Sequence, residues 1–165
     1  MATQAVHRLV IMRHAKAEQA AANDHARRLT DRGRSDAKSA GEWLAGSGHR
    51  PELILASSAA RAEETAEIVA TVAGVRRIEM LDGLYRADAY DAMDIVSAVG
   101  DDVGTVMVVG HNPTMAELAS LLQADDADVL RFPTSGIAVL ECDDELWTDL
   151  DGGQATLMTS YSSRA

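Results

Sequence analysis

The sequence predicts an α/β fold: a three-layer α/β/α sandwich with a mostly parallel central sheet and an antiparallel C-terminal hairpin. Short apolar runs of strand length alternate with helix-length segments through the first three quarters of the 165 residues. This alternation is typical of parallel strands joined by right-handed helical crossovers. The last quarter changes to apolar runs separated by acidic or glycine-containing turns, which favours antiparallel pairing. The length and the lack of a linker predict one domain over residues 1–165.

Seven strands are expected, each from an apolar or alternating run of four to eight residues. In chain order they cover residues 6–12, 53–56, 77–80, 105–109, 137–142, 146–150 and 154–161. The run TVMVV at 105–109 is the clearest buried strand, since it is apolar or β-branched throughout.

Four helices are expected, because apolar residues recur there every three or four positions. They cover residues 30–46, 59–73, 89–99 and 113–122. Thr30 is expected to cap the first helix, since a threonine hydroxyl accepts hydrogen bonds from the free N–H groups of a helix start. Asn112 is expected to cap the last helix, with Pro113 at its first position. Residues 82–88 are expected to form a loop.

The net charge of −11 is unevenly distributed along the chain. Residues 1–50 carry nine Lys and Arg against five Asp and Glu, whereas residues 51–165 carry six against 21. An acidic body repels nucleic acid and anionic membranes, so neither is expected as a partner. The first third can still form a local cationic site. Because 13 of the 15 cations are arginine, we expect guanidinium groups to bind phosphate there.

A cytoplasmic location is expected. Cys142 is the only cysteine, so no internal disulfide can form, which fits a reducing compartment. The apolar run near the N-terminus is too short for a signal peptide. No segment approaches the roughly 18 apolar residues of a membrane span. His7, His25 and His49 lack the spacing of metal ligands, and the last two are expected on the surface.

Two arginines and two histidines follow the predicted parallel strands. Arg13 and His14 end the first strand, Arg61 begins the helix after the second, and His111 follows the run TVMVV. The carboxyl ends of parallel strands meet at one edge of the sheet, where open α/β sheets bind their ligands. Arginine donates paired, charge-assisted hydrogen bonds to phosphate, and histidine is a donor or a nucleophile near neutral pH. The four side chains therefore predict a phosphate site.

The same residues resemble the signatures of the histidine phosphatase superfamily. In chain order the similar segments are Arg13-His14-Ala15, Leu29-Thr30-x-x-Gly33 followed by Ala37, Ser57-Ser58-x-x-Arg61-Ala62-x-x-Thr65-Ala66, and Gly110-His111-Asn112-Pro113. The short chain and the pair Leu84-Tyr85 are similar to its small SixA-like branch, whose best-known members remove phosphate from phosphohistidine in signalling proteins. The resemblance spans about residues 8–140.

The resemblance implies a phosphatase that needs no cofactor and no metal. It implies that His14 attacks phosphorus and forms a phosphohistidine intermediate, which water then hydrolyses. The residues that it implies bind the transferring phosphoryl group are Arg13, Arg61 and His111, joined by Arg27 or Arg28. The expected substrate is phosphohistidine in a protein.

One departure from the family pattern bears on the substrate. Many phosphatases of this superfamily carry a glutamate in the loop after the third strand, as proton donor to an ester leaving group. Residues 81–88 hold no glutamate here, although Asp82 and Asp88 are carboxylates in that loop. Two alternatives to a phosphohistidine phosphatase stay open: a phosphomonoesterase acting on a small phosphorylated metabolite, and a non-catalytic module that binds phosphate.

Overall fold

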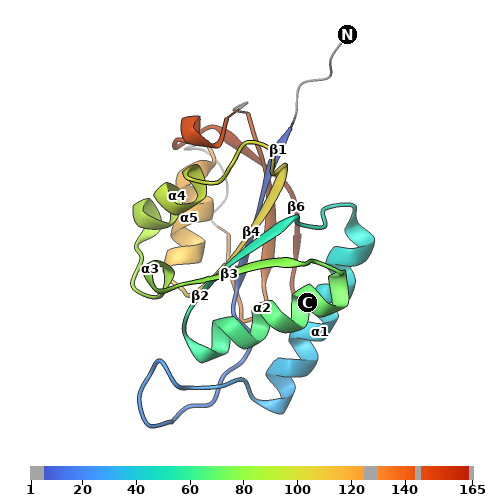
Figure 1. Ribbon diagram of the computed structural model, residues 1–165, viewed down its shortest axis with the longest axis vertical. Helices are drawn as coiled ribbons and strands as arrows, with labels where there is room; N and C mark the ends of the chain where they lie inside the picture. Colours follow the sequence, from blue (N-terminus) through green and yellow to red (C-terminus); the bar gives the residue numbers. More distant parts are fainter. Residues whose placement is uncertain (1–5, 125–129, 144–145, 164–165) are drawn as a thin grey trace.

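The computed structural model describes residues 6–124, 130–143 and 146–163, and they contain one six-stranded sheet. The strands lie in the order β3 (Arg77–Leu81), β2 (Leu53–Ser57), β4 (Thr105–Gly110), β1 (His7–Arg13), β5 (Ile137–Cys142) and β6 (Ala155–Tyr161). The first four are parallel, whereas β5 runs antiparallel to both β1 and β6. The predicted mostly parallel sheet with an antiparallel C-terminal pair is therefore confirmed (Figure 1).

Helices cover both faces of the sheet, which gives the expected three layers (Figure 1). The helices are α1 (Asp31–Ser47), α2 (Ala60–Ala73), α3 (Asp82–Tyr85), α4 (Ala89–Ser97) and α5 (Thr114–Leu122), with the 3-10 turn η1 (Trp147–Asp149). Alternate residues of β1 enter two separate cores: Val10 packs with residues of α1 and α2, and Leu9 packs with residues of α4 and α5. Alternation along a strand sends successive side chains to opposite faces. No helix among the described residues is long and apolar enough to span a bilayer.

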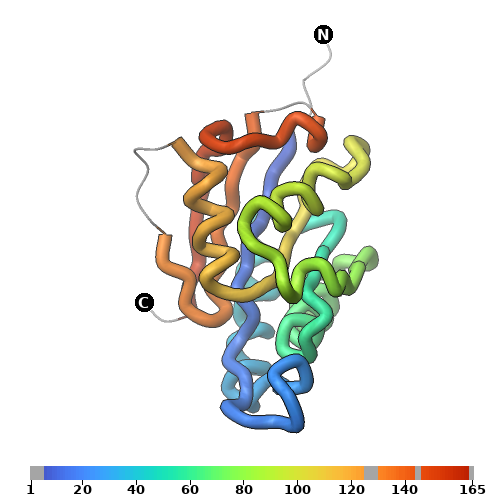
Figure 2. Tube along the Cα trace, turned by 90° about the vertical axis from the view of Figure 1, so that its left-hand side faces the viewer, coloured from blue at the N-terminus to red at the C-terminus, as the bar shows by residue number. Residues whose placement is uncertain are grey.

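The segment between β1 and α1 extends beyond the carboxyl edge of the sheet and lies next to the start of α2 (Figure 2). Thr30 caps α1 as expected, because its hydroxyl accepts a hydrogen bond of 3.0 Å from the Gly33 backbone N–H. A Cβ on Gly33 would lie 2.0 Å from the Lys16 carbonyl oxygen. Glycine is therefore required for α1 to approach the chain that leaves β1, and this contact fixes that segment over the sheet edge.

Three local expectations are wrong. Residues 146–150 form η1 and its flanks instead of a strand, because Trp147 is buried and its indole N–H donates to the Val103 carbonyl at 2.7 Å. The start of the expected loop at 82–88 is the short helix α3. The last helix begins at Thr114 and not at Pro113; Asn112 is not its cap, although its Oδ1 accepts a hydrogen bond of 3.3 Å from the Ala116 backbone N–H.

Candidate active site

The predicted cluster assembles at the carboxyl edge of the parallel strands. Arg13 is paired with Gly110 in neighbouring strands, so the residues that follow them, His14 and His111, lie side by side. Their ring centroids are 5.2 Å apart. The His14 backbone N–H donates to the Gly110 carbonyl at 2.9 Å. The two histidines are therefore held together by backbone pairing as well as by their side chains.

A buried threonine connects this edge to α2. The Ala15 backbone N–H donates to Thr65 Oγ1 at 3.0 Å, and that hydroxyl donates to the Arg61 carbonyl at 2.7 Å. Thr65 is fully buried, so water cannot replace either bond. The turn that carries His14 is consequently fixed against the helix turn that carries Arg61.

The ring of His14 is held in the tautomer that a nucleophile needs. Its Nδ1 lies 2.7 Å from the Ala15 carbonyl oxygen. A carbonyl only accepts, so Nδ1 carries the proton and Nε2 keeps its lone pair. Burial lowers the pKa of His14 to about 3. The hydrogen bond to the Ala15 carbonyl opposes this shift, and the positive charges of Arg61 and Arg13 add to it. His14 is thus neutral and able to attack phosphorus at physiological pH.

His111 is also neutral and fixed. Its Nε2 lies 2.7 Å from the Ser57 hydroxyl, which in turn accepts a hydrogen bond of 3.2 Å from the Ala59 backbone N–H. Burial lowers the pKa of His111 to about 4, and the charge of Arg61 adds to this effect. The hydroxyl at the end of β2 therefore orients a ring at the end of β4.

Three nitrogen atoms of the cluster are buried and have no hydrogen-bond partner among the described residues. They are Arg13 Nε, Arg61 Nε and His111 Nδ1. Arg61 is only 5% exposed. Buried N–H groups are normally paired, because an unpaired donor loses its hydration without compensation. The unpaired guanidinium N–H groups of Arg13 and Arg61 in one cationic cluster suit an anion with several acceptor oxygens, as phosphate has.

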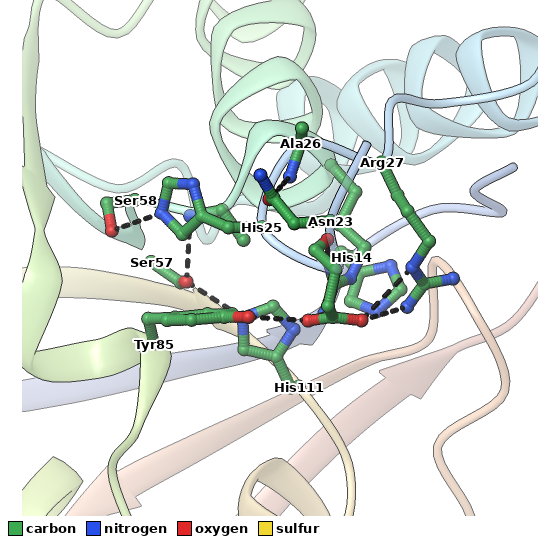
Figure 3. A network of polar contacts seen from close by, with 12 residues as sticks. His14, Asn23, His25, Ala26, Arg27, Ser57, Ser58, Tyr85 and His111 are labelled. Atoms are coloured by element: carbon green, nitrogen blue, oxygen red, sulfur yellow. Dashed lines mark hydrogen bonds and ion pairs between the residues drawn. The ribbon is translucent and has the colours of Figure 1, made fainter. Parts of the chain in front are cut away.

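Asp24 is a further member of the site that the sequence analysis did not select. Its Oδ2 accepts hydrogen bonds from Arg61 Nη2 at 3.1 Å and from the Tyr85 hydroxyl at 2.6 Å. Its Oδ1 accepts from Arg27 Nε at 3.1 Å. The side chains of Tyr85, Arg27, His14 and His111 gather around this network (Figure 3). The hydrogen bond from Tyr85, followed by those from Arg61 and Arg27, holds the pKa of Asp24 well below its usual range.

The sequence left open whether Arg27 or Arg28 joins the site, and the two arginines differ clearly in their contacts. Arg27 joins the Asp24 network, and its Nη1 also donates to the Glu18 carbonyl at 3.0 Å. Arg28 has a 65% exposed side chain that lies 3.8 Å from the Glu64 carboxylate. Arg27 is therefore linked to the cluster, and Arg28 is not brought to it.

A cavity of about 590 Å³ opens beside the cluster. The residues that line it are Asn23, Asp24, His25, Ser58, Asp82, Tyr85 and Arg86. His25 is exposed, as expected, but it belongs to this wall: its Nε2 lies 3.0 Å from Ser58 Oγ, and its ring meets the Tyr85 ring edge-on at 4.7 Å. Asp88 is outside the wall because it caps α4 through the Asp91 backbone N–H at 2.8 Å. The described residues include no group of side chains with the arrangement of a metal site.

The pKa values of the two site histidines predict how stability depends on pH. Both groups titrate near 6.5 when unperturbed, but at about 3 for His14 and about 4 for His111 in the folded protein. Between about pH 6.5 and pH 3 the unfolded chain therefore binds more protons than the folded chain. The stability that these histidines contribute is complete above pH 6.5 and is lost as the pH falls through this window.

Urea unfolding of the ligand-free protein at several pH values checks this expectation. The wild type should lose more stability between pH 7 and pH 4.5 than a variant with His14→Gln and His111→Gln, since the carboxylates that also titrate are common to both. Parallel curves for the two proteins would contradict it.

Three comparisons with known proteins bear on the family of this chain. The family model "Histidine phosphatase superfamily (branch 1)" matches residues 9–94. An uncharacterized protein of Mycobacterium tuberculosis is 38% identical over 162 residues, which is 93% of this chain and all of that protein. The solved structure of a putative phosphohistidine phosphatase SixA from Nakamurella is 32% identical, with a TM-score of 0.84 and coverage of 97% and 98% of the two chains.

A second solved structure, of the protein histidine phosphatase SixA with tungstate, is 28% identical, with a TM-score of 0.81 and coverage of 94% and 96%. The matched family model, the sequence relative and the two solved structures together identify the family of the chain. It belongs to the histidine phosphatase superfamily and is a phosphatase.

Proposed function

We propose that this phosphatase hydrolyses phosphohistidine in proteins and that His14 is its nucleophile. The observation that carries the proposal is the state of His14: buried, neutral, and with Nδ1 committed to the Ala15 carbonyl, so that Nε2 is the free atom. The similarity of the whole chain to two SixA structures supports the choice of substrate. A non-catalytic phosphate-binding module is not retained, because the chain belongs to a phosphatase family.

In the first step His14 Nε2 forms a bond to phosphorus while the P–N bond of the substrate breaks. The substrate imidazole takes a proton from solvent on its free nitrogen and leaves as a neutral ring. Arg13, Arg61 and His111 stabilise the equatorial oxygens, which is the main requirement of phosphoryl transfer. Their fixed positions mean that little reorganisation is needed as the charge moves.

In the second step water attacks the phosphorus of phospho-His14 and the P–Nε2 bond breaks. The protons of the attacking water leave with phosphate and solvent. The Nδ1–H of His14 stays bonded to the Ala15 carbonyl throughout, so the ring leaves as the neutral tautomer and is ready for another turnover. This carbonyl is therefore expected to favour both formation and release of the intermediate.

The carboxylates beside the site favour a substrate that needs no donor from the protein. Asp24 already accepts hydrogen bonds on both oxygens, and Asp88 caps α4. Asp82 alone remains of the two loop carboxylates that could serve an ester, and it is exposed at the cavity wall. An alkoxide leaving group needs a positioned acid, which contributes about 10²–10⁴-fold. A phosphoramidate can instead be protonated by solvent.

The expected order of kcat/KM is therefore phosphohistidine protein, then nitrophenyl phosphate, whose phenol is acidic, then alkyl phosphate esters. The measurement is a release assay for inorganic phosphate on the three substrates with wild type and with Asp82→Asn. The variant should leave phosphohistidine hydrolysis nearly unchanged. Efficient cleavage of alkyl esters that is abolished by Asp82→Asn would show that a donor is present, and a phosphatase acting on small metabolites would then be the better assignment.

A further inference from the structure

We propose that Asp24 is a positioning residue for phosphoryl transfer: it holds the guanidinium group of Arg61 by its outer edge and leaves the remaining donors of that group for the phosphoryl oxygens. The geometry that points to this role is a double attachment. Arg61 Nη1 donates to the Asp24 backbone carbonyl at 2.8 Å, and Arg61 Nη2 donates to Asp24 Oδ2 at 3.1 Å. Two bonds from one residue fix both the position and the rotation of a planar fork.

The attachment leaves a defined set of donors. A guanidinium group has five N–H bonds, and Asp24 takes one from Nη1 and one from Nη2. Arg61 Nε is buried and has no partner among the described residues. Because Arg61 is 95% buried, solvent cannot supply the missing acceptor easily. The free donors thus lie on the part of the group that Asp24 does not occupy, where a tetrahedral anion can bind.

The hydrogen bonds of Asp24 exclude a role as acid or base. Oδ1 accepts from Arg27 through Nε at 3.1 Å and lies 3.0 Å from Nη2, and Oδ2 accepts from Arg61 and Tyr85. Two donors on each oxygen leave no strongly basic lone pair. The same bonds keep the carboxyl group ionised, so it has no proton to donate. What remains is orientation of the cations that surround it.

Asp24 could instead be an internal anion that occupies the phosphate position until substrate displaces it, but the backbone around it is fixed. The Ala60 backbone N–H donates to the His25 carbonyl at 2.9 Å, which ties the segment to the start of α2. The Ala26 backbone N–H donates to Asn23 Oδ1 at 2.9 Å, which closes a turn around Asp24. Moving the whole residue would break these bonds as well as the backbone bond to Arg61, and rotating the carboxylate alone would still leave Arg61 Nη1 bonded to the Asp24 carbonyl. A permanent support for Arg61 is therefore the better interpretation.

The test is a double-mutant cycle between Asp24 and Arg61, measured with nitrophenyl phosphate so that it does not depend on the natural substrate. Asp24→Ala should lower kcat on the order of 100-fold, the cost of misplacing a catalytic group by about 1 Å. Asp24→Asn keeps one acceptor and should lose about 10-fold. Inhibition by inorganic phosphate should not weaken more than about 2-fold in either variant, because removing a negative charge offsets the looser arginine.

The measurement that decides whether Asp24 acts through Arg61 is the effect of Asp24→Ala in a protein that already carries Arg61→Ala. There Asp24→Ala should change kcat less than about 3-fold, because a residue that acts through Arg61 has nothing left to position. Asp94→Asn, which removes an exposed carboxylate on α4, is the matched control in both backgrounds. Thermal unfolding followed by circular dichroism shows which variants are folded at the assay temperature. If Asp24→Ala does not fold, Asp24→Asn completes the cycle.

Two results would overturn the proposal. Equal or faster turnover in the Asp24 variants, with tighter inhibition by phosphate, would show a competing anion. An undiminished loss in the Arg61→Ala background would show that Asp24 acts independently of Arg61.

Discussion

Replacing His14 by alanine (His14→Ala) is expected to lower turnover of nitrophenyl phosphate by at least about 10⁴-fold, to near the uncatalysed rate. The variant lacks the Nε2 atom that would bond to phosphorus. The other histidine of the cluster, His111, cannot replace it in the same way, because its Nε2 is bonded to the Ser57 hydroxyl, whereas in His14 the bonded atom is Nδ1. Phosphate and vanadate should still bind, since Arg13, Arg61 and His111 remain. The measurements are steady-state kinetics and calorimetric titration with vanadate.

His49→Ala is the matched control, because it removes a histidine near the end of α1 that makes no side-chain contact with the cluster. It should keep wild-type turnover. Robust activity in His14→Ala, with normal vanadate binding, would remove His14 from the chemical step.

Arg61→Ala is expected to reduce kcat by on the order of 10²–10³-fold, the loss typical of removing one preorganised donor. Arg61 is buried at the first turn of α2, and its Nε, which has no partner among the described residues, belongs to the cluster that we propose binds the phosphoryl group. Arg61→Lys should recover little activity. A lysine ammonium has no planar fork, so it cannot bond to the carbonyl and carboxylate of Asp24 and still present a second edge to phosphate.

The measurement is kcat with nitrophenyl phosphate under saturating conditions, with inhibition by inorganic phosphate as the ground-state readout. Arg76→Ala provides the control, since it removes an exposed arginine from the turn before β3. Near-normal kcat in both Arg61 variants would exclude Arg61 from the transition state.

The edge where the site lies could be predicted because parallel strands place their carboxyl ends together. Arg13, His14 and His111 follow or end parallel strands, which was enough to predict that they lie at one edge. The register of β1 and β4, which pairs Arg13 with Gly110, then places His14 beside His111. The place of Arg61 at this edge could be predicted because it lies in the first turn of the helix that follows β2. These are local signals that tertiary packing reinforces.

The parts that the sequence did not predict depend on contacts between distant residues. Asp24 meets Arg61 across 37 positions and Tyr85 across 61, and no periodicity relates them. The sequence feature that pointed most directly to Asp24 was its position three residues before Arg27, with which it pairs. Ser57 lies within one of the signature segments, but its hydrogen bond with His111 depends on the pairing of β2 with β4. The strand expected at residues 146–150 is absent because burial of the Trp147 side chain favours a 3-10 turn there, although the sequence pattern is typical of a strand.

The proposed mechanism depends on a covalent phosphohistidine that forms on His14. Rapid acid-free quenching of wild type with a ³²P-labelled substrate tests it directly, followed by alkaline peptide mapping. The expected result is a stoichiometric, acid-labile and base-stable label on the peptide that contains His14, and no label in His14→Ala. A label on another residue, or full turnover with no label trapped at any time point, would contradict the mechanism.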